Sequence, residues 1–133
     1  MHPAAVPGRG ELVLVTDDDP DMLDIVSTLL DASGFEVMTA ANGREALDRV
    51  GTRMPSVILL DMRMPVMDGW QFAAEFRARF PDGAKLVVMT AAEHASQRAA
   101  EIRADGWLAK PFALSKLVES VRAQLESSPN SGT

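Results

Sequence analysis

The chain has 133 residues, of which 47% are hydrophobic and 24% charged, and this length and composition predict one globular domain. Its formal net charge of −6 argues against direct nucleic-acid binding, since a domain that holds phosphate backbones carries an excess of Lys and Arg. It has no cysteine, no apolar run near the roughly 20 residues that span a bilayer, and no secretory signal in residues 1–10, so we expect a cytoplasmic protein without membrane contact.

Apolar runs that stop at polar or turn residues alternate along the chain with amphipathic stretches of helical period. In chain order, the predicted strands and helices fall at residues 12–16, 20–34, 35–39, 42–51, 57–60, 68–80, 86–90, 96–104, 107–109 and 114–125. Five alternations of strand and helix indicate a parallel sheet with helices on both faces. We predict a flavodoxin-like (βα)5 α/β fold with a five-stranded parallel sheet of order 2-1-3-4-5.

The two ends of the chain differ in composition from the middle. Residues 1–10 are rich in Pro and Gly without periodicity and predict a flexible lead-in, and residues 127–133 form a polar tail. A single domain over residues 11–126 is therefore expected, without internal repeats.

Side chains typical of helix starts precede several of the predicted helices. Asp19 stands before a proline, and Asn42 is followed three residues later by Glu45. Asp68 and Gln71 have the spacing of a capping box. These patterns favour a structural role for Asp19 and Asp68.

The last two predicted helices differ in how strongly they should hold to the sheet. Residues 96–104 are small and polar, with Ile102 as the one sizeable aliphatic side chain, so this helix should be weakly held and able to move. The final helix has a full apolar stripe at helical spacing, made of Leu114, Leu117, Val118, Val121 and Leu125.

Polar side chains follow the predicted strands where the strands end. Asp17 and Asp18 follow the first strand, Asp61 the third and Lys110 the fifth, while Thr90 ends the fourth. Because parallel strands end at one edge of the sheet, these side chains should meet there. Three carboxylates and one ammonium sum to −2, which a divalent cation would balance, and oxygen ligands in a shallow site favour Mg²⁺. Asp61 is then the candidate nucleophile for phosphoryl transfer.

Four motifs in this order resemble the receiver domains of two-component response regulators, including the chemotaxis regulators. They are Leu-Val-Leu-Val-Thr-Asp-Asp-Asp-Pro, Leu-Leu-Asp-Met-Arg-Met-Pro-Val-Met-Asp-Gly, Val-Val-Met-Thr-Ala and Leu-Ala-Lys-Pro-Phe. The resemblance covers about residues 12–125, which is nearly the whole chain.

The resemblance implies a role for each residue of the predicted edge. Asp61 would accept a phosphoryl group from the phosphohistidine of a sensor histidine kinase or a histidine phosphotransfer protein. Asp18 and Asp61 would bind Mg²⁺ directly and Asp17 directly or through water, together with the backbone carbonyl of Arg63. Lys110 would pair with the phosphoryl oxygens.

The resemblance also implies a switch. The Thr90 hydroxyl would be drawn toward the phosphoryl group, and Trp107 at the switch aromatic position would change orientation with it. The surface of the fourth helix, fifth strand and fifth helix would then bind a downstream protein target, with a phosphorylation-dependent dimer as a further expectation. Such a protein is not an enzyme beyond catalysing its own phosphorylation and dephosphorylation. It is either a single-domain regulator or a fragment without its output domain.

Other interpretations of these residues stay open at this point. Trp107 also fits a core position, Lys110 a plain turn and Thr90 an ordinary strand end. A Mg²⁺-dependent phosphatase with an aspartyl nucleophile is an alternative function, although Arg63 stands where haloacid-dehalogenase-like phosphatases place a second acid. An unphosphorylated scaffold of the same fold is another.

Four residues depart from the family pattern, among them Ala113, which lacks the capping side chain common before the last helix. Thr16 ends the first strand where an aliphatic residue is common, and Arg103 takes a place often held by glycine. Arg63 lies two residues past the predicted acceptor, and we hypothesise that its guanidinium alters the lifetime of the phosphoryl group.

Overall fold

The computed structural model describes residues 10–126, so the predicted tail and residues 1–9 of the predicted lead-in lie outside the described residues. Five strands alternate with five α-helices. In chain order they are β1 (Leu12–Thr16), α1 (Pro20–Ala32), β2 (Glu36–Ala40), α2 (Gly43–Thr52), β3 (Val57–Asp61), α3 (Gly69–Arg79), β4 (Lys85–Ala91), α4 (Ala95–Glu101), β5 (Gly106–Lys110) and α5 (Leu114–Glu126).

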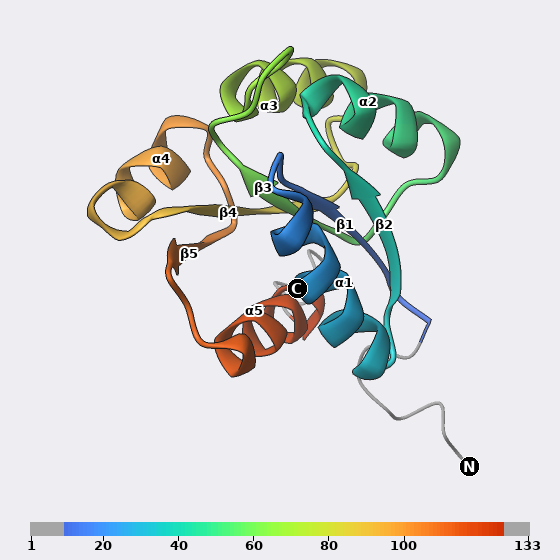
Figure 1. Cartoon of the computed structure of the whole chain (residues 1–133). Helices are drawn as coiled ribbons and strands as arrows, with labels where there is room; N and C mark the ends of the chain where they lie inside the picture. Colours follow the sequence, from blue (N-terminus) through green and yellow to red (C-terminus); the bar gives the residue numbers. More distant parts are fainter. Residues whose placement is uncertain (1–9, 127–133) are drawn as a thin grey trace.

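The strands form one parallel sheet in the order β2-β1-β3-β4-β5, as predicted. Helices α1 and α5 cover one face, and α2, α3 and α4 cover the other (Figure 1). Within the described residues, no helix is long and apolar enough to cross a bilayer.

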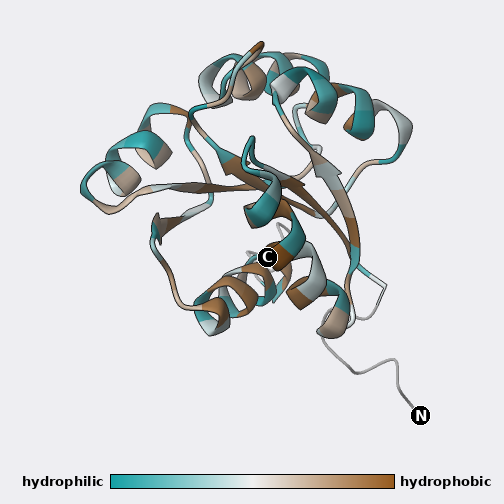
Figure 2. Cartoon of the chain, viewed as in Figure 1, coloured by the Kyte–Doolittle hydropathy of each residue, from teal (hydrophilic) through white to brown (hydrophobic). Residues whose placement is uncertain are grey.

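The central strands are apolar on both sides because both faces of the sheet are covered. In β1, Val13 and Val15 pack with the residues of α1 and α5, while Leu14 packs with those of α2 and α3. Every residue of β1 and β3 is buried. Figure 2 shows the resulting hydrophobic sheet between helices with hydrophilic outer sides. Such burial is the main stabilising contribution to the fold and holds the carboxyl ends of the strands in fixed register.

The predicted helix starts are confirmed, with one difference of partner. The Asp19 carboxylate accepts from the Asp21 N–H, and Asp68 forms a complete capping box with its residue three positions on. The Asn42 side chain accepts from the Glu45 N–H, whereas the Glu45 carboxylate accepts from the N–H of Ala41 rather than from that of Asn42. This carboxylate therefore ties α2 to the residue that follows β2.

Several element bounds differ from the predicted ones for local reasons. Phe35 precedes β2 and Phe80 follows α3, although both are apolar. The fourth helix ends at Glu101 instead of residue 104, because Arg103 takes a left-handed conformation with φ 53°, in which a helix stops. Leu114, predicted on the apolar stripe of α5, is 45% exposed because it lies in the first turn, before the helix reaches the sheet.

Candidate functional site

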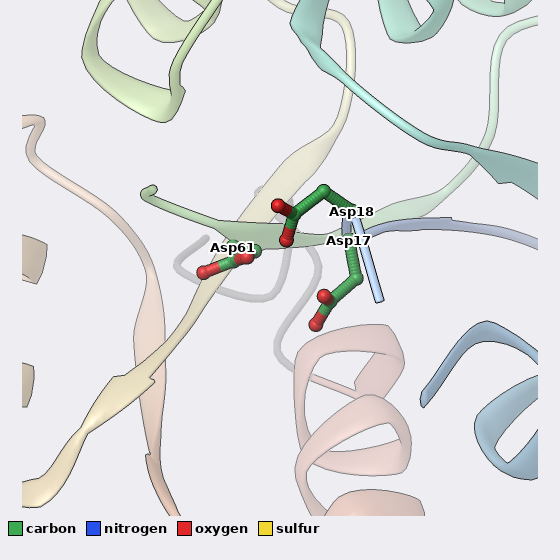
Figure 3. A group of neighbouring side chains, drawn as sticks. All are labelled: Asp17, Asp18 and Asp61. Atoms are coloured by element: carbon green, nitrogen blue, oxygen red, sulfur yellow. The ribbon is translucent and has the colours of Figure 1, made fainter. Parts of the chain in front are cut away.

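Three carboxylates gather at the carboxyl edge of the sheet, as the sequence predicts. Asp17 and Asp18 follow β1 and Asp61 ends β3, so two adjacent strands bring them together (Figure 3). One oxygen of each lies within 4.8 Å of the others. Asp17 and Asp61 are buried, whereas Asp18 is exposed. The site therefore opens to solvent on the Asp18 side.

Lys110 is the cation of this cluster, supplied by the last residue of β5. Its Nζ donates a hydrogen bond to Asp17 Oδ2 at 2.9 Å and lies 3.9 Å from Asp61 Oδ1. One ammonium against three carboxylates leaves the cluster at −2 when all are ionised, and such like charges repel strongly in a partly buried site. The charge arrangement predicted from the sequence is thus present.

The backbone behind Asp61 is held in a fixed position. The Asp61 Oδ1 atom accepts from the Arg63 N–H at 3.4 Å, and the Gly69 N–H donates to the Met62 carbonyl at 2.9 Å. A Cβ at Gly69 would lie 2.7 Å from Met62 Cα, so only glycine allows α3 to begin this close to the strand end. The start of α3 thereby fixes the loop that follows the carboxylate.

Burial raises the pKa of Asp61 to about 7. The nearby Asp17 carboxylate raises this pKa further, while the Lys110 ammonium and the Arg63 N–H lower it. Without a bound metal ion, Asp61 is therefore partly protonated near neutral pH. A bound divalent cation would favour its ionised form.

Thr90 and Arg63 lie at the same edge but outside the ion pairs, whereas Trp107 lies nearer the start of β5, opposite Val88. Register places Thr90 one residue beyond Met89, which pairs with Asp61, and its hydroxyl forms no hydrogen bond with any described residue. Trp107 is 52% exposed, so the interpretation of this side chain as a core residue is wrong for this state. The Arg63 side chain is exposed.

Two cavities add residues that were missed by sequence reasoning. A shallow cavity of about 330 Å³ beside the carboxylates is lined by Asp18, Met62, Arg63, Met64, Asp68 and Trp70. Trp70 packs partly against the core, and its place on α3 next to the capping box is the sequence signal that puts it at this edge. A larger cavity of about 540 Å³ lies at the opposite edge of the sheet, between the starts of β3 and β4 and the end of α5, and holds none of the predicted site residues.

Comparison with known proteins identifies the family of the chain that carries this site. Residues 13–122 match the family model of the response regulator receiver domain. The chain belongs to this family. It is thus a receiver domain of two-component response regulators, which confirms the first of the three functions considered from the sequence.

The receiver domain is similar to the transcriptional regulatory protein PrrA of Mycobacterium tuberculosis, with 41% identity over 123 residues, 91% of this chain and 52% of PrrA. The chain thus spans about half the length of the curated relatives it matches. The chemotaxis response regulator CheY4 of Vibrio cholerae has a similar structure (TM-score 0.78, 32% identity, 86% of this chain and 98% of that one). So does TrrA of Thermotoga maritima, solved in complex with Mg²⁺-BeF (TM-score 0.76, 30% identity, 86% and 98%).

Proposed function

We propose that Asp61 accepts a phosphoryl group from the phosphohistidine of a sensor histidine kinase or of a histidine phosphotransfer protein. The observation that carries this proposal is the convergence of Asp17, Asp18, Asp61 and Lys110 at one edge of the sheet, in a chain of the receiver family. Response regulators pair with histidine kinases, which supplies the donor.

The donor set fits Mg²⁺. Asp17, Asp18 and Asp61 offer carboxylate oxygens only, and the exposed side of the site leaves room for waters. One oxygen of each carboxylate lies within 4.8 Å of the others, so the three side chains could share one small, hard divalent cation. We propose these three carboxylates and the Arg63 carbonyl as its protein ligands. The ion would supply charge neutralisation for the attacking and transferred oxygens.

The chain's own residues then have distinct parts in the transfer. An ionised Asp61 oxygen attacks phosphorus, an O–P bond forms, the P–N bond of phosphohistidine breaks, and the electron pair returns to the imidazole. Lys110 already lies 3.9 Å from Asp61 and places its charge where the phosphoryl oxygens arrive. The Thr90 hydroxyl, which has no partner among the described residues, is available to bind one of these oxygens.

The binding of a downstream partner follows from the charge that phosphorylation brings to the site. The phosphoryl group carries about 1.5–2 negative charges in place of the single charge of the Asp61 carboxylate, and the hydrogen bond from Thr90 would change the place taken by the exposed Trp107 on β5. We propose that the α4, β5 and α5 surface then binds a downstream protein target or a second copy of the domain. The protein would act as a cytoplasmic signalling phosphoacceptor that catalyses only its own phosphorylation and dephosphorylation.

Labelling with acetyl phosphate tests the acceptor. We expect one phosphoryl group per chain by intact mass, formed only with Mg²⁺ present, and none in Asp61→Asn, because the amide cannot act as the nucleophile. Asp82→Asn is the matched control, since Asp82 lies in the exposed turn between α3 and β4 and should be labelled as the wild type. Labelling of Asp61→Asn equal to the control, or none in the wild type while another receiver domain is labelled, would contradict the assignment.

A further inference from the structure

A three-residue cluster joins α3 to α4 on the outer side of the sheet. The Trp70 Nε1–H donates to Glu101 Oε1 at 2.8 Å, and the Arg98 guanidinium lies 5.1 Å from the centre of the Trp70 ring. Arg98 Nη1 lies 3.5 Å from Glu101 Oε2, which closes the triangle. We call these three residues the α3–α4 clamp. Its indole contributes a hydrogen bond to a charged acceptor and a cation–π contact at once.

Apolar packing of α4 is slight compared with that of the other helices. Its buried residues are two alanines, Ala95 and Ala99, while the following Ile102 is half-buried against the core. The whole helix has seven residues, and the 3₁₀ turn Ala92–His94 before it buries none. Since small side chains bury little apolar area, a few polar contacts hold a larger share of the free energy that docks α4.

The clamp also reaches the acceptor site. Trp70 lines the shallow cavity that contains Asp18 and Arg63, and it follows Gly69, whose N–H bonds the Met62 carbonyl directly behind Asp61. The indole therefore lies at the closely packed start of α3 and contacts the weakly packed helix α4. The hydrogen bond from Trp70 also lowers the pKa of Glu101, which keeps its carboxylate ionised for Arg98.

We propose that the α3–α4 clamp is a conformational latch. The clamp holds α4 docked in the unphosphorylated domain, and its opening is coupled to occupation of the acceptor site. The strength of the clamp then sets how readily the domain changes from the unphosphorylated to the phosphorylated conformation. This proposal rests on the proposed function. The latch residues act through α4 and are not catalytic residues.

Hydrogen exchange of the full chain tests the docking step. We expect the amides of α4 to exchange about tenfold faster in Trp70→Phe and Glu101→Ala, since each change removes the charge-assisted hydrogen bond. Trp70→Phe keeps an aromatic ring, and urea unfolding establishes that both variants fold. Glu75→Ala is the matched control, because Glu75 is a helical glutamate on α3 that pairs with Arg79 and stands outside the clamp. Unchanged exchange in α4 of both clamp variants overturns the proposal.

Titration with beryllofluoride and Mg²⁺, a phosphoryl mimic, tests the coupling. If conversion opens the clamp, variants without it bind the mimic more tightly, by up to the same tenfold, because the wild type must first break these contacts. In the wild type, the indole N–H resonance of Trp70 should also move toward that of a free indole. Faster exchange with an unchanged dissociation constant overturns the coupling. Absence of binding in the wild type refutes the proposed function as well, while the exchange data still decide whether the clamp holds α4.

Discussion

At the scale of single residues, the proposed acceptor site places charge where it destabilises the fold. Asp61 is buried beside the Asp17 carboxylate, and both burial and this like charge disfavour its ionised form. The Lys110 ammonium, 3.9 Å away, does not offset them, because the pKa of Asp61 is still raised to about 7. The sequence could predict the meeting of these residues, because each directly follows an apolar strand. It could not predict which carboxylate is buried, since that depends on how the loops after β1 and β3 fold over them.

Asp61→Asn should stabilise the domain at pH 8 without Mg²⁺. The folded pKa of about 7 exceeds the unfolded value of 3.8, so the folded state holds the proton more tightly and stability falls as pH rises from about 4 to 7. Part of the carboxylate contacts solvent, which screens its charge, so we expect a gain of about 1–2 kcal/mol at pH 8.

Urea unfolding with a chelator at pH 8 and pH 5 measures this difference. At pH 5 the folded wild type is protonated at Asp61 while the unfolded chain is already mostly ionised, so the gain should fall to about 40% of its value at pH 8. A gain of equal size at both pH values would show that the amide acts through packing rather than charge.

Thr16→Val should stabilise the domain by about 1 kcal/mol. Thr16 is fully buried at the end of β1, and its Oγ1 has no hydrogen-bond partner among the described residues. Valine has almost the same shape and removes the unsatisfied hydroxyl. Thr39→Val on the half-buried edge strand β2 is the control and should change the free energy of unfolding by less than about 0.5 kcal/mol. A destabilised Thr16→Val would indicate that the hydroxyl has a partner in solution.

At the scale of elements, the positions of most strands and helices could be predicted, and the exceptions have local causes. Long apolar runs and helix caps locate β1, β3, α1 and α3. The end of α4 could not be located, because it depends on Arg103 in a left-handed conformation that arginine rarely adopts. The pattern of α5 predicted a buried Leu114, since periodicity gives the face of a helix and not where along its length the sheet begins.

Val66→Asn should raise the free energy of unfolding by about 1 kcal/mol. Val66 lies in the loop between β3 and α3 with φ 69°, a conformation strained for a β-branched residue, and its side chain is 79% exposed, so little packing is lost. Asparagine tolerates this conformation. Val66→Thr keeps the branched Cβ and should give no gain in the same urea titration, whereas a gain there would point to relief of apolar exposure instead of backbone strain.

At the scale of the whole molecule, the fold could be predicted because the strands are apolar runs that end at polar or turn residues, and these alternate with helical patterns along the sequence. The parallel order then brings chemistry from distant positions to one edge, and the family match over residues 13–122 agrees with it. Contacts between helix surfaces are a different matter. The cluster of Trp70, Arg98 and Glu101 joins positions 31 residues apart, and no local pattern announces such a pair.

Mg²⁺ should raise the thermal stability of the wild type at pH 8. A ligand that binds only the folded state at ten times its dissociation constant adds about 1.4 kcal/mol, which corresponds to a rise of about 4–6 °C for a domain of this size. Calorimetry with and without MgCl₂ at constant ionic strength measures it. Asp18→Asn should lose most of the rise, and an equal rise in that variant would remove Asp18 from the ligands.

The two sides of the loop behind Asp61 differ in how far they can yield. On the α2 side, the Gly43 N–H donates to the Met67 carbonyl at 2.8 Å, and a Cβ at Gly43 would lie 2.7 Å from that oxygen. The two backbone segments are therefore in direct contact, with no space for either to shift toward the other. On the α4 side, only two buried alanines and a few polar contacts oppose displacement of the helix. If occupation of the carboxylate site displaces its surroundings, we therefore expect the displacement to appear at α4 rather than at α2.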